Sequence, residues 1–315
     1  MQNVTDSERT AALTIDNLQT SSNRVRREQF VRVLLFFLVS VSVVISAVLI
    51  FSLIKEAWVF MVGVDWSDTW TRGWYPRRGE YDIRTLFVAS LITTAIAMAV
   101  AGPIGLAAAI YLSEYATSKV RAFVKPILEI LAGIPSVVLG FFALFFIAPE
   151  IIGRINEDAS AGSLAAAGVG VGLLTIPLVA SVSEDAMKAV PSELREGASG
   201  LGARKVTIAT RVVFPAAISG IVASFIVATS RALGETMVVF IAGGAADSAG
   251  YTHSPFDGSL TMTAAMASLA SGTDQVKGEG YTFQSLYFVG LLLFLITFVL
   301  NLLADRFVKR VRERY

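Results

Sequence analysis

Two opposite charges four residues apart, Arg231 and Glu235, lie in a stretch of sequence that is otherwise free of charge from residue 212 to residue 246. A guanidinium presents a planar fork of hydrogen-bond donors that matches the oxygens of phosphate and similar oxyanions. A carboxylate one helical turn away can orient that guanidinium and weaken its hold on an anion, since conduction requires release as well as binding. The pair therefore indicates an anion pathway, and a self-neutralising pair that locks helix packing is the structural alternative.

The composition places these charges in a membrane protein. Of the 315 residues, 54% are hydrophobic and 16% are charged, against roughly 25% charged in soluble domains, and the mean hydropathy is +0.65. The sequence has no cysteine and one histidine, His253, which argues against disulfides, metal sites built on thiolates and histidine-based catalysis. A net charge of +1 gives no electrostatic reason to expect nucleic-acid binding.

Six long windows with almost no charge predict six transmembrane helices in an all-α integral membrane fold. They are residues 33–54, 85–113, 130–149, 159–183, 212–247 and 280–304. The polar residues 1–29 are expected to form a cytoplasmic tail without a cleavable signal, followed by the permeation domain at 30–315. Arg231 falls near the middle of the fifth window, where an arginine costs roughly 2.5–3.5 kcal/mol on insertion scales, so ordinary packing would not retain it.

The distribution of Lys and Arg predicts which connections face the cytoplasm. With the amino terminus inside, the inner segments carry 18 basic residues and the outer segments carry 7. This excess indicates that both termini are cytoplasmic, because connections rich in basic residues stay on that side of the membrane. In the first outer loop, Trp58 and Trp66 are expected at the membrane interface, whereas Trp70 and Trp74 are expected to pack within the loop.

The inner connection at about residues 185–215 is long, mixed in charge and punctuated by glycine. Pro191 can open a helix, because its missing N–H would be unpaired there in any case. Residues 192–199 and 203–214 are predicted as two short helices joined by a bend at Gly200 and Gly202. Together they predict a rigid knob that faces the cytoplasm.

The spacing within this knob resembles the EAA motif of ABC-importer permeases. The motif falls on Glu196, Gly197, Ala198, Gly202 and Pro215, and all of these but Gly197 carry the motif's own residue. Three positions depart from the motif, which has Ala, Ile and Leu where this sequence has Gly197, Val212 and Phe214. The resemblance implies a type I (MetI-like) importer permease fold and a coupling loop that docks on a separate ATPase subunit.

Other segments resemble the phosphate-importer permeases and favour a PstC-type over a PstA-type subunit. They are residues 231–237 (RALGETM), 133–140 (GIPSVVLG) with Glu129 before it, and 102–103 (GP) followed by 110–114 (IYLSE). The resemblance implies a heterodimer with a PstA-type permease, a PstB-type ATPase dimer that binds ATP and Mg, and a PstS-type phosphate-binding protein, in the bacterial inner membrane. No cofactor is expected in this chain, whose sequence has no G-x-x-x-x-G-K-[ST] phosphate loop. A sulfate or molybdate importer is the nearest alternative.

The remaining candidates are polar or proline residues expected at membrane depth. Glu129 is predicted about one turn inside the third span, where it either serves the pathway or is solvated at the inner interface. Ser136 adds a hydroxyl that could face an anion. Pro103, Pro135 and Pro177 are each predicted inside a span, where a kink and a freed carbonyl either shape the pathway or its gate, or only shape the helix.

Two further patterns concern helix packing and the outer surface. Gly168, Gly170 and Gly172 predict a small surface for close helix contact. Residues 258–273 are charge-free with apolar residues at roughly helical spacing, which predicts a segment at the outer interface or part of a gate. The outer loops are the expected surfaces for a solute-binding protein.

Two other classes of protein compete with the transport hypothesis. A membrane-embedded enzyme using Arg231 and Glu235 on a phosphate ester predicts catalysis by the isolated chain, but the sequence offers no nucleophile–base pair and no metal cluster. A scaffold whose knob only recruits a partner predicts that the charge pair is dispensable. The proteins that co-purify with the tagged chain would separate these classes.

Overall fold

The structure, a computed structural model, describes residues 22–66, 73–244, 250–271 and 280–312. The chain divides into two units, residues 1–52 and 53–315, and each is described by itself. The first unit holds most of helix α2 (Ser22–Gly63), whose large apolar side chains between residues 30 and 51 are mostly exposed. A helix that is apolar on every side requires an apolar environment, and a lipid bilayer supplies one.

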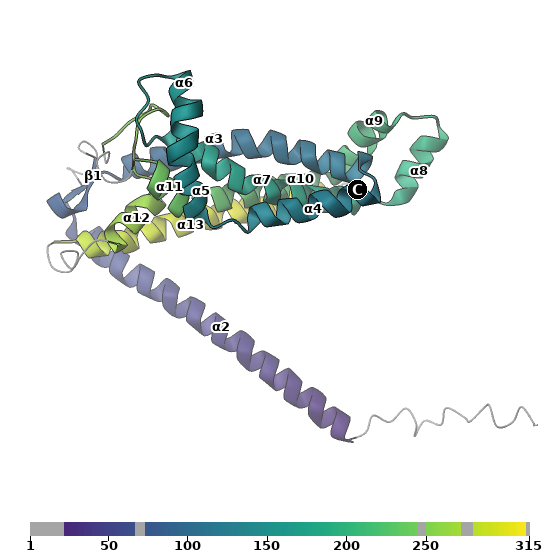
Figure 1. Cartoon of the computed structure of the whole chain (residues 1–315). Helices are drawn as coiled ribbons and strands as arrows, with labels where there is room; N and C mark the ends of the chain where they lie inside the picture. Colours follow the sequence, from purple (N-terminus) through teal and green to yellow (C-terminus); the bar gives the residue numbers. More distant parts are fainter. Residues whose placement is uncertain (1–21, 67–72, 245–249, 272–279, 313–315) are drawn as a thin grey trace, which may run out of the picture. The chain divides into compact units, whose positions relative to one another are not determined.

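The second unit is a helical bundle in which the label η marks three π-helical segments and one 3-10 turn among the described residues (Figure 1). Its helices are α3 (Ile83–Ile110), η3 (Tyr111–Tyr115), α4 (Ser118–Ala132), α5 (Ser136–Phe142), η4 (Ala143–Ile152), α6 (Gly153–Ile155), α7 (Leu164–Lys188), α8 (Ser192–Gly200), α9 (Lys205–Ile208), η5 (Ala209–Val213), α10 (Phe214–Leu233), α11 (Met237–Ala242), α12 (Met262–Ala270) and α13 (Thr282–Arg312). The described residues include six helical segments long and apolar enough to cross a membrane. They are Arg26–Gly63, Ile83–Tyr115, Ser136–Ile155, Leu164–Lys188, Lys205–Leu233 and Thr282–Lys309. The prediction of six transmembrane helices is confirmed.

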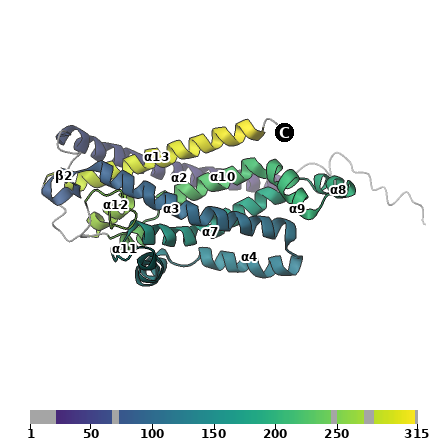
Figure 2. The same ribbon diagram turned by 90° about the horizontal axis from the view of Figure 1, so that it is seen from above.

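Helix α7 forms the centre of the second unit, packed against both α3 and α10 (Figure 1, Figure 2). A β-carbon added at Gly168 would lie 2.8 Å from the Ile96 side chain, and one at Gly172 would lie 2.9 Å from that of Val100. Gly170 approaches α11 and η4 equally closely. The predicted surface of small residues is therefore confirmed, and it lets the α3 and α7 backbones approach more closely than larger residues would permit.

A short hairpin lies at the end of this unit opposite to α8 (Figure 1). Strands β1 (Trp74–Tyr75) and β2 (Glu80–Tyr81) pair antiparallel through the 3-10 turn η2 (Pro76–Arg78), with Trp74 opposite Tyr81. Trp74 is buried, and its ring lies edge-on to that of Tyr81 with a centroid distance of 5.8 Å. The expectation that Trp74 packs within the loop is confirmed, whereas Trp70 lies outside the described residues.

The predicted start of the third span is wrong. Residues 130–132 end the amphipathic helix α4, and the membrane-crossing helix begins at Ser136. Pro135 lies in the connection between the two helices, not inside a span as predicted. A proline lacks the N–H that would continue the helix and disfavours helical geometry in the residue before it. The third span was predicted from the absence of charged residues, and that criterion does not reveal a helix break at a proline.

The predicted extent of the fifth span is also wrong at both ends. Residues 205–213 (α9 and η5) are not a separate surface helix but run directly into α10 as one crossing segment, Lys205–Leu233. Helix α10 then ends at Leu233, and the chain turns through Gly234 before α11 begins at Met237. Pro215 fits in the continuous helix because it occupies the first turn of α10, directly after the π-helical segment η5.

Candidate functional site

A cavity of about 500 Å³ lies between α4, α7 and α10 and brings together several of the predicted site residues. Its lining residues are Lys125, Leu128, Glu129 and Ala132 from α4, Leu174, Pro177, Leu178, Ser181 and Glu184 from α7, and Val227 and Arg231 from α10. Arg231, Glu129 and Pro177 thus share one cavity although they come from three helices. Most of the wall is apolar; among its charged residues Glu184 is buried and Lys125 half-buried, whereas Arg231 and Glu129 are exposed.

Arg231 lies in the last turn of α10, and its side chain is exposed. A cation at this end of a helix interacts favourably with the carbonyls that have no partner within the helix. The guanidinium therefore occupies a favourable position on its helix while it faces a largely apolar cavity.

The predicted pairing of Arg231 and Glu235 on one helix face is wrong, because the helix ends between them. Glu235 follows the break, and its Oε1 accepts hydrogen bonds from the backbone N–H of Met237 at 3.2 Å and of Val238 at 3.4 Å. The ion pairs found among the described residues do not join Arg231 to Glu235. The carboxylate caps the start of α11, and this role depends on the hydrogen bonds of the turn and not on charge neutralisation.

Glu129 lies in the last turn of α4 and not inside the third span, which corrects the predicted position. It nevertheless lines the cavity, together with Lys125 one turn earlier on the same helix. Ser136 is the first residue of α5 and is not among the lining residues, and neither is Pro103, which is exposed on α3. Among the three candidate prolines, Pro177 is the one that is buried and reaches the cavity.

The sequence did not predict a charged cluster that reaches the cavity through Lys125 and Glu184. Glu184, only 1% exposed, forms ion pairs with Arg121 of α4, at 3.6 Å, and with Lys188 one turn further along α7. Lys125 lies 3.6 Å from Asp185. The one available signal was the i, i+4 spacing of Glu184 and Lys188; the contacts with α4 depend on tertiary packing.

The loop predicted to couple to the ATPase begins with α8, and Gly202 lies in the turn that ends this helix. This residue has φ +77°, and the N–H groups of Gly202 and Ala203 bond to the carbonyls of Ser199 at 2.9 Å and Ala198 at 3.1 Å. This pattern is the Schellman motif, which requires a left-handed residue at its centre. The predicted helix at 192–199 and the bend after it are confirmed.

Only one side of α8 is anchored to the bundle. Ala198 and Ala203 pack against a buried apolar cluster that includes Met187, Ile208 and Val213. Glu196 and Gly197 are exposed, and so are two leucines of the loop: Leu194 is 48% exposed and Leu201 is 91% exposed. The outer side of this loop thus carries two large apolar side chains that no other part of the described chain covers.

Comparisons with known proteins identify the family of the chain. Residues 101–313 match the family described as "Binding-protein-dependent transport system inner membrane component". The phosphate transport system permease protein PstC of Mesorhizobium japonicum is 30% identical over 282 residues, which cover 84% of each chain. The PstC protein of Haemophilus influenzae is 32% identical over 297 residues, which cover 88% of this chain and 91% of that protein.

Solved structures of ABC importers share the fold. A bacterial ABC transporter involved in the import of the acidic polysaccharide alginate aligns with a TM-score of 0.63 at 12% identity, covering 91% of this chain and 97% of that chain. An inward-facing MetNI methionine ABC transporter aligns with a TM-score of 0.53 at 19% identity, covering 73% and 95%. The predicted MetI-like permease fold is therefore confirmed. The chain belongs to the inner membrane components of binding-protein-dependent transport systems and, among them, to the PstC family of phosphate transport permeases.

Proposed function

We propose that this chain is a permease subunit of an ATP-driven phosphate importer and that the cavity between α4, α7 and α10 is part of the phosphate path. The observation that carries the proposal is the presence of Arg231 and Lys125 in one largely apolar cavity of a PstC-family chain. An arginine fork binds phosphate oxygens in a bidentate manner, and a lysine adds a point charge.

Carboxylates at the same cavity keep this attraction moderate. Glu129 lines the wall near Lys125, and Glu184 is held by Arg121 and Lys188. An anion path must release its substrate, so cations without nearby acidic groups would bind phosphate too tightly. Glu235 serves indirectly, because its capping of α11 fixes the turn that follows Arg231.

The exposed side of α8 is proposed to dock on the ATPase dimer, which binds ATP and Mg. The exposed leucines of the loop, Leu194 and Leu201, support this role. We assign the second half of the path to a PstA-type permease. A PstS-type binding protein is proposed to deliver phosphate at the end opposite to α8. In this assignment the chain itself performs no chemical reaction; catalysis by the isolated chain would refute it.

Substitution of Arg231 tests the proposal. In proteoliposomes containing the complete transporter, Arg231→Ala is expected to lower ATP-dependent uptake of radioactive phosphate at least roughly tenfold, because a charged hydrogen bond to the substrate is worth about 1.5–3 kcal/mol. Arg231→Lys should retain part of the uptake, because it keeps the charge but loses the fork.

Two controls make the result decisive. Arg154→Ala removes an exposed arginine that pairs with Glu150 within one helical segment, and it should leave uptake unchanged. Competition by sulfate and molybdate during wild-type uptake distinguishes a phosphate importer from the alternative oxyanion importers. Normal phosphate uptake by Arg231→Ala in an assembled complex would remove Arg231 from the path.

A further inference from the structure

Arg195 in α8 is joined to two transmembrane helices at once. Its Nη1 donates to the carbonyl of Val190 at 2.6 Å and its Nη2 to the carbonyl of Met187 at 2.8 Å, at the end of α7. Nη2 also lies 3.2 Å from Oε1 of Glu114 in η3, and Nε lies 3.5 Å from Oε2 of the same carboxylate. One guanidinium therefore connects α8 to α7 and to the end of α3.

The Arg195–Glu114 pair is built more firmly than an ordinary surface ion pair. The side chains are 25% and 8% exposed, so water screens their attraction only in part. Ser113 donates a hydrogen bond from its Oγ to Oε1 of Glu114 at 2.8 Å, which orients the carboxylate. The two carbonyls that Arg195 binds lie at and just after the end of α7, and that of Met187 also accepts the backbone N–H of Val190 at 3.2 Å.

A second arginine, Arg121, binds the same π-helical segment. Nη2 of Arg121 in α4 donates to the carbonyl of Leu112 at 2.6 Å and to that of Ser113 at 3.3 Å. Arg121 and Arg195 thus bind neighbouring residues of η3. Because α4 also lines the cavity, an unbroken series of contacts runs from α8 through η3 and α4 to Lys125 and Glu129. π-Helical segments often mark sites where a helix changes shape during function.

We propose that Arg195 is a positioning residue that transmits movements of α8 to the helices around the cavity, with Glu114 as its partner. The proposal rests on the proposed function, because it requires α8 to receive movement from an ATPase. Besides Arg195, α8 and the turn after it place two small residues, Ala198 and Ala203, against the buried apolar cluster of the bundle. Without Arg195, such a helix can move without shifting α3 or α7, and ATP hydrolysis would then be uncoupled from the cavity.

The first test measures the cavity directly and does not depend on phosphate transport. The sequence has no cysteine, so Ala132→Cys places a single thiol in this chain at the cavity wall. In the complete complex, ATP binding is expected to change the rate at which a water-soluble maleimide labels this thiol. Adding Arg195→Gln or Glu114→Gln should abolish the ATP-dependent change, while Arg154→Gln should preserve it.

The second test measures coupling in proteoliposomes. The amount of phosphate imported per ATP hydrolysed is expected to fall roughly tenfold in Arg195→Gln and in Glu114→Gln, while ATP hydrolysis continues. The loss of one charged hydrogen bond shifts an equilibrium by about this factor. The double variant should be no worse than the worse single variant, since both changes remove one link. Arg195→Lys keeps the charge and should show an intermediate ratio of phosphate imported to ATP hydrolysed. This variant tests the proposal even if the Arg195→Gln complex fails to assemble.

The two proposals fail in distinguishable ways. If the wild-type complex imports no phosphate, the proposed function is refuted. The thiol-labelling comparison still tests whether Arg195 transmits movement, because it does not measure phosphate. If the ATP-dependent labelling persists in Arg195→Gln and Glu114→Gln, or if the effects of the two substitutions multiply, transmission through this pair is refuted. Equal losses of hydrolysis and import would indicate a purely structural role and would also refute it.

Discussion

At the scale of single residues, the coupling loop contains two glycines of the EAA pattern that serve different purposes. Gly202 has φ +77° and ends α8, a conformation that residues with a β-carbon adopt only at a cost. Gly197 lies within α8, and a β-carbon there would meet no atom within 4 Å. The backbone therefore requires glycine at 202, whereas at 197 it tolerates the alanine that the EAA motif has.

Substitution of these two glycines by alanine gives a matched comparison. Gly202→Ala is expected to destabilise the end of α8 by about 1–2 kcal/mol and to reduce the ATPase subunit retained by the tagged complex during washing in detergent. Gly197→Ala should retain as much ATPase as the wild type, because alanine favours a helix by about 1 kcal/mol over glycine. Equal retention by the two variants would show that the geometry at Gly202 does not matter for docking.

At the scale of helices, the bundle is determined by how closely α3 and α7 approach. Gly172 of α7 faces the Val100 side chain and the carbonyl of Ala97. A β-carbon at residue 172 would lie 2.9 Å from Cβ of Val100 and 3.0 Å from that carbonyl oxygen, closer than atoms pack without a shift. The helices must separate, or Val100 must move, to accept even one methyl group.

Gly172→Ala is accordingly expected to destabilise the protein by about 1–3 kcal/mol, the usual cost of overpacking. The measurement is the thermal unfolding midpoint of the purified chain in detergent. Gly133→Ala is the control, since its β-carbon would meet its nearest neighbour at an ordinary 3.4 Å. Adding Val100→Ala to Gly172→Ala should recover part of the loss, and an unchanged midpoint in Gly172→Ala would contradict the close-packing interpretation.

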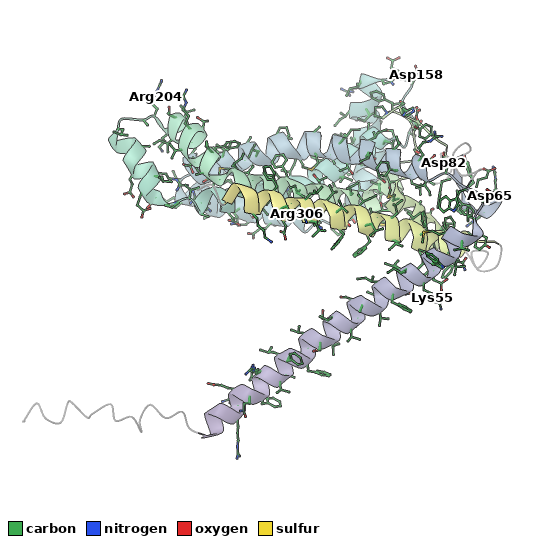
Figure 3. The ribbon with its side chains drawn as sticks, turned by 180° about the vertical axis from the view of Figure 1, so that it is seen from behind. Lys55, Asp65, Asp82, Asp158, Arg204 and Arg306 are labelled. Carbon is green, nitrogen blue, oxygen red and sulfur yellow. The ribbon has the colours of Figure 1, made fainter. Side chains whose placement is uncertain are left out.

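At the scale of the whole second unit, the bundle has two ends that can be told apart by the residues they carry. Figure 3 shows Arg204, beside α8, and Asp158, beyond α6, at opposite ends of this unit. The carboxyl-terminal end of α13 lies at the same end as α8 (Figure 2). The two segments therefore face the same side of the membrane, and the excess of basic residues predicts that this side is the cytoplasm.

The cysteine-free sequence allows a direct test of this orientation. In intact cells with permeable outer layers, Asp158→Cys should react with a membrane-impermeant thiol reagent, because residue 158 faces outward in the expected topology. Arg204→Cys should react only after the cells are opened or in inside-out vesicles. The reverse pattern of labelling would overturn the assignment of the inner and outer ends.

The sequence by itself determined the number of membrane crossings and the family, because both depend on local composition and on short spacings. Apolar windows of sufficient length must be helical in lipid. The α8 segment and its glycine bend were predictable for the same reason, since a Schellman motif is a local structure. The packing surface of Gly168 and Gly172 also followed from residue type alone.

Tertiary structure alone decided which charges meet. The sequence predicted Arg231 and Glu235 on one helix, but the helix ends before Gly234. Glu235 therefore caps α11, whereas Arg231 lines the cavity. Glu129 lies at the cavity because α4 packs beside α7, and this packing could not be predicted from the charge-free windows. Ion pairs such as Arg195–Glu114 join residues 81 positions apart, and the cost of burying them is offset only once the folded helices bring both partners together.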